Sequence, residues 1–183
     1  MDYKYFNVDK WPIVFLSTNG INIMIDDNFD NFKREYLSLL VKCKKNNEQI
    51  SLICNITSTN NFDIKNIMKF ANFNKEIYNF NKAYVKCVAI LCADKSFKNI
   101  LNLYFTFAKP SSPYKLCRSY MKVDKYFKEK WNLSIDSSYY NNNDKTRSCQ
   151  YDNDNDDDDE DIGQDYINEE ENTYNNELEE IKI

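Results

Sequence analysis

Residues 83–92 read AYVKCVAILC, and this stretch decides the fold of the chain. Nine of its ten residues are apolar, counting tyrosine and cysteine, and Lys86 is the exception. A short, nearly unbroken apolar run is typical of a β-strand that is covered on both faces. We therefore predict that residues 83–92 form a central strand of a sheet with helices packed on it.

Predicted strands and helices alternate on both sides of this run. Residues 49–56 repeat the buried-strand pattern, and residues 62–80 predict a helix with Ile64, Ile67, Met68 and Ala71 on one stripe. Residues 96–108 predict a further helix, which ends before Pro110 because proline disfavours a helical residue ahead of it. Residues 114–120 predict a strand and residues 122–131 an amphipathic helix. Such alternation implies parallel strands joined by helical crossovers.

The first 45 residues add a hairpin and a helix. Residues 3–8 and 12–17 predict two strands, and Asn19–Gly20 then predicts a tight turn into residues 21–25, where isoleucines alternate. Asp26 and Asp27 predict the capped start of a helix that continues to Cys43. The sequence thus predicts an α/β fold: a mixed, mostly parallel sheet with an N-terminal hairpin and about four helices.

Charge divides the chain into two parts. Residues 151–183 contain fifteen acidic residues and one basic residue, Lys182, whereas the net charge of all 183 residues is -5. The first 150 residues are therefore strongly basic. Apolar periodicity stops after Leu133, so we expect a folded domain over residues 1–133 and a polar spacer with a disordered acidic tail over residues 134–183. No stretch approaches the roughly 20 apolar residues that span a bilayer.

Three stretches resemble the STAS domain, in its SpoIIAA-like branch of anti-sigma-factor antagonists and their relatives. These are the helix start DDNF at residues 26–29, the strand 50–55 with the loop 56–61, and FTFAKPSSP at residues 105–113. The resemblance covers about residues 3–133. It implies a SpoIIAA-like fold and a module that acts by binding other proteins, although some relatives bind nucleotides or lipids.

The resemblance also implies a phosphorylation site. Antagonists of this branch carry a phosphorylatable serine at the start of the second helix, and the matching loop contains Thr57, Ser58 and Thr59. Ser58 is the residue that would correspond. The small-residue and glycine pattern around that serine is missing here, and helix capping is the simpler role for these hydroxyls.

Composition excludes several kinds of chemistry. The chain contains no histidine, so a Ser-His-Asp or Cys-His nucleophile cannot be built. Its two glycines, Gly20 and Gly163, make no phosphate-binding loop. Six scattered cysteines form no C-x-x-C pair, so we expect reduced thiols and no metal site. We expect no cofactor and no enzymatic activity.

Two features exceed what a packed domain needs. The helix over residues 96–108 already has a complete core stripe, and Leu103 and Phe107 widen its apolar face. A basic run follows with interleaved tyrosines, and its candidate partner-binding residues are Lys109, Lys115, Arg118, Lys122 and Lys125. Nucleic-acid binding would use such cations for phosphates and the tyrosines for stacking. A solvated helix face with buried aromatic rings explains the same pattern and is favoured.

These observations predict a non-catalytic protein-interaction or regulatory module. The alternative is a protein that binds lipid or an anionic membrane surface through the basic residues together with Leu103 and Phe107. The polar start of the chain lacks the apolar stretch of a signal peptide, so we expect a cytoplasmic protein. We also expect the acidic tail to contact the basic face of its own chain.

Overall fold

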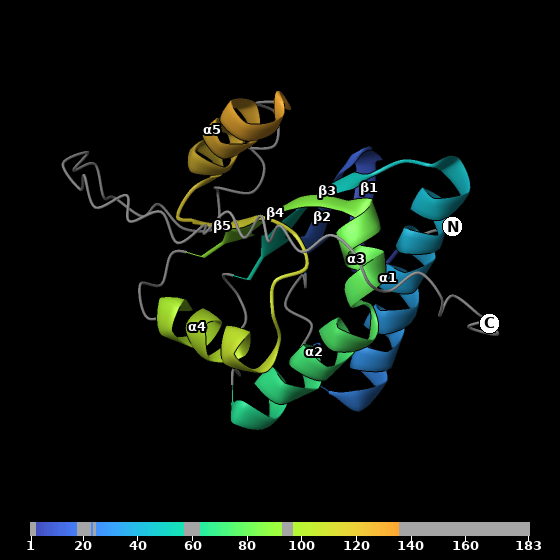
Figure 1. Cartoon of the computed structure of the whole chain (residues 1–183), viewed down its shortest axis with the longest axis vertical. Coiled ribbons are helices and arrows are strands. Elements are labelled where there is room, and N and C mark those ends of the chain that lie inside the picture. The colour runs from blue at the N-terminus through green and yellow to red at the C-terminus, as the bar shows by residue number, and fades with distance from the viewer. Residues whose placement is uncertain (1–2, 18–22, 24, 57–62, 93–96, 136–183) are drawn as a thin grey trace, which may run out of the picture.

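The computed structural model describes residues 3–17, 23, 25–56, 63–92 and 97–135 (Figure 1). Strands and helices alternate through most of these residues, as the sequence predicts. The elements in chain order are β1 (Phe6–Lys10), β2 (Ile13–Ser17), α1 (Asp26–Asn46), β3 (Ile50–Asn55), α2 (Ile64–Glu76), α3 (Tyr78–Tyr84), β4 (Val85–Leu91), α4 (Phe97–Phe107), β5 (Tyr114–Cys117) and α5 (Tyr120–Trp131).

The five strands form one mixed sheet in the order β1-β2-β3-β4-β5. Strands β1 and β2 are antiparallel, and β2 to β5 are parallel. The apolar run of β4 lies between β3 and β5, with Val88 opposite Leu52 on one side and Tyr114 on the other. The predicted fold class and the central place of this strand are confirmed.

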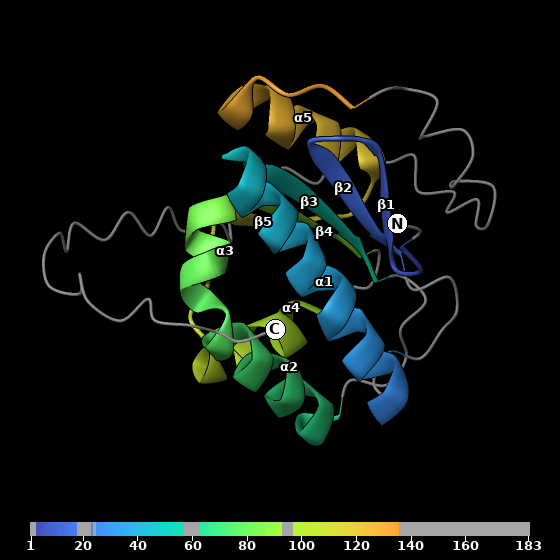
Figure 2. The same cartoon turned by 90° about the vertical axis from the view of Figure 1, so that its right-hand side faces the viewer.

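Helices cover both faces of the sheet, but unequally (Figures 1 and 2). Helices α1 to α4 lie on one face, and α5 lies on the other. Alternation along β4 separates the two sides: Val88 and Ile90 pack with the first layer, while Cys87 and Ala89 pack under α5. Nearly every residue of β4 is therefore in apolar surroundings, which explains its unbroken apolar run.

Aromatic rings fill the core between α1 and the sheet. Phe32 stacks on Phe6 with ring centroids 5.6 Å apart, and Phe29 meets Phe70 of α2 edge to face at 5.0 Å. Ring pairs of this kind add to the free energy that burial of their area supplies. They fix α2 beside α1. Under α5, the core is completed by Val123, Phe127 and the chain that follows the helix, where Ile135 is only 5% exposed.

The N-terminal hairpin differs from the prediction. It joins β1 to β2, and its turn includes a hydrogen bond of 3.1 Å from Trp11 N to Val8 O. Residues 21–25 were expected to form a strand, but the described Ile23 lies in a turn and Ile25 directly precedes α1. The Asn19–Gly20 turn lies outside the described residues.

The single helix expected over residues 62–80 is in fact two. Helix α2 ends at Glu76, α3 begins at Tyr78, and Ile77 between them has φ -105° and ψ 13°. The described residues therefore contain five helices rather than about four. Helix α3 also includes Ala83 and Tyr84, which the sequence assigned to the central strand.

No helix within the described ranges is both long enough and apolar enough to cross a membrane. Residues 136–183 lie outside these ranges, and so does the expected disorder of the acidic tail.

Candidate functional site

The structure divides the predicted partner-binding residues between two sides of the molecule. Leu103 and Phe107 lie in α4, and Lys109 follows that helix, so all three belong to the layer that covers one face of the sheet. The other four lie at the opposite layer: Lys115 in β5, Arg118 in the loop after it, and Lys122 and Lys125 in α5. No single surface contains both groups. Ser58 lies outside the described residues.

On α4, Leu103 and Phe107 lie on the flank that faces away from β5. Phe105 marks the opposite flank, because its ring lies 4.5 Å from that of Tyr114 in β5. An α-helix turns 100° per residue, so Leu103 and Phe107 project about 160° from Phe105. Helix α2 packs against α4 (Figure 1), and because Phe105 faces β5 we infer that the opposite flank is the one nearer α2. Both side chains are half-buried, and neither joins the three core clusters of the described chain.

Helix α2 presents two further apolar residues to the same region. Its aromatic residues Phe70 and Phe73 face α1. Ile64 and Met68 project about 120–180° away from these rings, on the flank toward α4. They are 60% and 43% exposed. We call the surface formed by Ile64, Met68, Leu103 and Phe107 the α2–α4 seam.

Sequence reasoning missed half of this seam. The prediction placed Ile64 and Met68 on one buried stripe with Ile67 and Ala71, but only the latter two are buried. Ile67 and Ala71 lie on the edge of the stripe that is covered. Ile64 and Met68 lie on its other edge, which remains exposed. Nothing in the apolar spacing of a single helix distinguishes the covered edge from the uncovered one.

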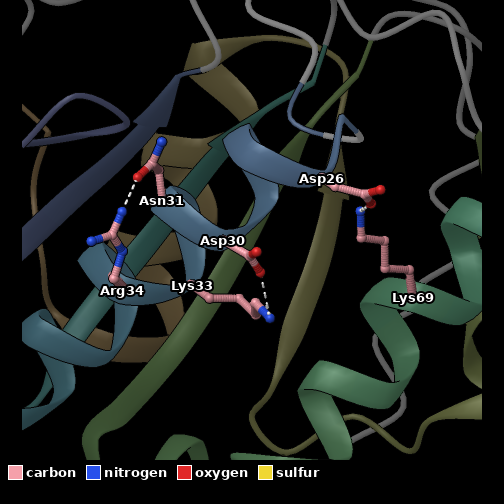
Figure 3. A network of polar contacts seen from close by, with 6 residues as sticks. All are labelled: Asp26, Asp30, Asn31, Lys33, Arg34 and Lys69. Carbon is pink, nitrogen blue, oxygen red and sulfur yellow. Dashed lines mark hydrogen bonds and ion pairs between the residues drawn. The ribbon is translucent and has the colours of Figure 1, made fainter. Parts of the chain in front are cut away.

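Polar contacts cap α2 and connect it to its neighbours. Asp63 caps the helix by accepting a 2.7 Å hydrogen bond from Asn66 N. Lys69 Nζ lies 2.6 Å from Asp26 Oδ1 at the start of α1, as Figure 3 shows. The Lys69 ammonium lowers the pKa of the Asp26 carboxyl. Toward α4, Asn74 Nδ2 donates to Lys109 O at 3.5 Å.

The second surface is made by α5 and by the end of β5 with the loop that follows it, and we call it the α5 basic face. Its cationic residues are Lys115, Arg118, Lys122, Lys125, Lys128 and Lys130. Two of them have acidic neighbours one turn away: Lys128 lies 2.6 Å from Asp124, and Lys125 lies 3.9 Å from Glu129. Met121 is 75% exposed among these charges. The face combines positive charge with one long apolar side chain.

The tyrosines of the basic run are turned inward. Tyr120 and Tyr126 are buried against the sheet, and Tyr114 packs on Phe105 of α4. Rings in these positions cannot stack on the bases of a nucleic acid. The arrangement matches the solvated helix face with buried aromatic rings that the sequence favoured.

A cavity of about 450 Å³ opens where β2, β3 and β4 begin. Its lining includes the buried hydroxyl of Ser51, which accepts a 3.4 Å hydrogen bond from Cys87 Sγ, and the side chains of Glu48 and Lys86. Glu48 is engaged by Trp11 Nε1 at 2.9 Å. The lining of the cavity thus includes one lysine and one carboxylate that is already hydrogen-bonded.

Three of the described thiols are poor nucleophiles. Burial raises the pKa of Cys43 and Cys87 to about 11 and that of Cys54 to about 12. At neutral pH they are neutral, and the thiolate is the reactive form. Within the described ranges, no three cysteine, aspartate or glutamate residues gather in a way that could hold a metal ion.

Comparisons of the chain with protein families, with curated proteins and with solved structures found no match.

Proposed function

We propose that this protein is a non-catalytic interaction module that binds another protein segment at the α2–α4 seam. The observation that carries the proposal is the seam itself: four large apolar side chains from two adjoining helices lie outside the core clusters of the described chain. Ile64 and Met68 are exposed and Leu103 and Phe107 are half-buried, and a grouped, partly exposed apolar surface of this kind is typical of protein-binding sites.

The energetics of the seam suit an amphipathic partner. Full burial of an exposed Met, Leu, Ile or Phe side chain contributes roughly 1.5–3 kcal/mol before the cost of association is subtracted. The gain is smaller at Leu103 and Phe107, which are already half-buried. An amphipathic helix laid along two helices makes such contacts with apolar residues spaced three or four apart. The resemblance to SpoIIAA-like STAS domains, which mostly act by binding other proteins, agrees with this reading.

Paired variants of the full chain test the proposal. Met68→Ser with Leu103→Ser removes two seam side chains, whereas Asn72→Ser with Asn102→Ser changes exposed polar residues of the same helices. We expect at least one protein in lysate of the expressing cells to be captured by the wild type and by the polar control. Its capture by the seam variant should fall on the order of tenfold, as a loss of about 1.4 kcal/mol implies.

Equal capture of every protein by both variants would contradict the proposal, provided that both retain the far-UV circular dichroism and unfolding midpoint of the wild type. These checks matter because the seam residues lie beside buried Ile67 and Ala71.

The α5 basic face supports a second candidate function, binding to an anionic membrane surface. The supporting observation is Met121, which is 75% exposed amid the lysines of an amphipathic helix. Surface-binding helices combine cations with an apolar side chain that enters the lipid boundary. Because Leu103 and Phe107 lie on the other layer, this function would rest on α5 alone. Met121→Ser should then weaken sedimentation with phosphatidylserine vesicles, and the Met68→Ser, Leu103→Ser variant should not.

A further inference from the structure

We propose that the α2–α4 seam binds residues 167–183 of the same chain as an amphipathic helix. The inference rests on the proposed function and names an occupant for its site. Residues 167–183 read INEEENTYNNELEEIKI. Apolar residues recur at Ile167, Tyr174, Leu178 and Ile181, which fall within about 60° of one another on a helix of 3.6 residues per turn. Such a stripe matches the helix-in-groove mode of recognition, in which anchors recur at helical spacing.

Charge complements this apolar match. Residues 167–183 contain six acidic residues and one lysine. The segments that form the seam, residues 63–76 and 97–109, contain five lysines and two acidic residues. Of those two, Asp63 is occupied in capping α2. Lys65, Lys75 and Lys109 are exposed on α2 and just after α4. An acidic helix would meet apolar side chains at its centre and lysines at its rim, which favours this occupant over a basic one.

The chain is long enough for this contact. Residues 136–173 separate Ile135, the last described residue, from Tyr174, and 38 residues can span more than about 100 Å when extended. A domain of about 130 residues has a radius of gyration near 14 Å, so the segment can reach the opposite layer. Attachment to the same chain also raises the local concentration of the segment to roughly millimolar, so a weak contact is populated.

Photocrosslinking in the full chain tests the inference. The photoreactive residue p-benzoylphenylalanine replaces Leu178 in one protein and Asn176 in another, because position 176 lies on the opposite side of the predicted helix. We expect the probe at position 178 to crosslink peptides from residues 64–76 and 97–107 within one chain. The yield should exceed that from position 176 on the order of tenfold, and Phe107→Ser should reduce it by a similar factor.

Three outcomes would overturn the inference. The first is equal crosslinking from both positions, and the second is crosslinking from position 178 mainly to α5. The third is crosslinking only between chains, which a mixture of isotopically light and heavy protein distinguishes by mass. The proposed function would survive any of these outcomes if the Met68→Ser, Leu103→Ser variant still loses a captured protein that the polar control retains. Conversely, intramolecular crosslinks at the seam without any captured protein would leave residues 167–183 as its only supported ligand.

Discussion

The hydroxyl of Tyr36 in α1 donates a 2.8 Å hydrogen bond to Oδ1 of Asn81 in α3, and both residues are buried. Asn81 Nδ2 donates in turn to Asn74 Oδ1 of α2 at 2.9 Å, and its backbone oxygen accepts from Ser112 Oγ at 3.3 Å. One asparagine, through its side chain and its backbone oxygen, thus connects three helices and the loop before β5. Burial raises the pKa of Tyr36 well above 10.0, so its hydroxyl keeps the proton that it donates.

Removal of this hydroxyl should destabilise the domain. Tyr36→Phe leaves the buried Asn81 oxygen without its donor, and such a loss costs about 1–3 kcal/mol. Urea unfolding followed by circular dichroism measures the change. Tyr84→Phe is the matched control, because the Tyr84 hydroxyl makes no hydrogen bond with any residue that the structure describes. Equal unfolding midpoints for the two variants would show that the Tyr36–Asn81 bond contributes nothing net.

The same asparagine shows why the helix boundary escaped prediction. Apolar periodicity continues from Ile64 through Phe80, and no proline or glycine interrupts it. Beside the break at Ile77, Asn81 bonds to Tyr36 and Asn74, which are 45 and 7 residues away in the sequence. A tertiary contact of this kind has no local signal. The β4 run, in contrast, carries its own evidence, because burial on both faces requires apolar residues at successive positions.

The candidate site, like the fold, could be predicted only in part from the sequence. Leu103 and Phe107 lie beside the core stripe of their helix, and their spacing in the sequence predicts this. Their separation from Lys122 and Lys125 could not be predicted, because it depends on the return of the chain to the other face of the sheet after β5. Because these residues are close in the sequence, they suggested one surface, but the fold divides them between two.

A charge in β4 should unfold the domain. Ala89 is completely buried between the sheet and α5, so Ala89→Asp would place a carboxylate without a partner in an apolar site. The expected cost is at least several kcal/mol, which is comparable to the whole stability of a small domain. Asn99→Asp, on the exposed side of α4, is the control and should stay folded. A cooperative thermal transition for Ala89→Asp near that of the control would contradict the central position of β4.

The buried thiols predict a loss of stability at alkaline pH. The pKa of Cys43, Cys54 and Cys87 is raised from 9.0 to about 11 or 12 in the folded chain. Above pH 9 the thiols of the unfolded chain lose their protons while those of the folded chain keep them. Ionisation therefore stabilises the unfolded state relative to the folded state. Their stabilising effect is complete below pH 9 and is lost as pH rises toward the folded pKa values. At pH 10 the free energy of unfolding should fall by roughly 1 kcal/mol per thiol.

Urea unfolding at pH 7 and pH 10 measures this dependence. Cys54→Ala should lower stability at both values and should reduce the difference between them, because one raised pKa has been removed. An identical pH difference in the wild type and in Cys54→Ala would contradict the assignment.

The last prediction concerns residues 152–161, which we call the acidic run, and the α5 basic face. Eight of the ten residues in 152–161 are acidic, and the basic face carries six cations against Asp124 and Glu129. Ile135 packs beside α5, and the 16 residues between it and Asp152 span about 20–25 Å at random-coil dimensions. The run can therefore return to α5 and compete with any anionic surface for it. Exposed ion pairs contribute little each, and salt screens them within about 8 Å at physiological ionic strength, so the competition should appear at low salt.

Neutralisation of the run tests this competition without removing residues 167–183. Replacement of the eight acidic residues in 152–161 by Asn or Gln should strengthen binding to phosphatidylserine vesicles several-fold at 20 mM salt, roughly the range in which screening is weak. The difference should shrink as salt rises toward 150 mM. Lys122→Gln with Lys125→Gln should weaken binding in both backgrounds and reduce the difference between them, since the two lysines belong to the surface for which run and vesicle compete. Equal vesicle binding by the wild type and the neutralised chain at low salt would show that residues 152–161 do not occupy the α5 basic face.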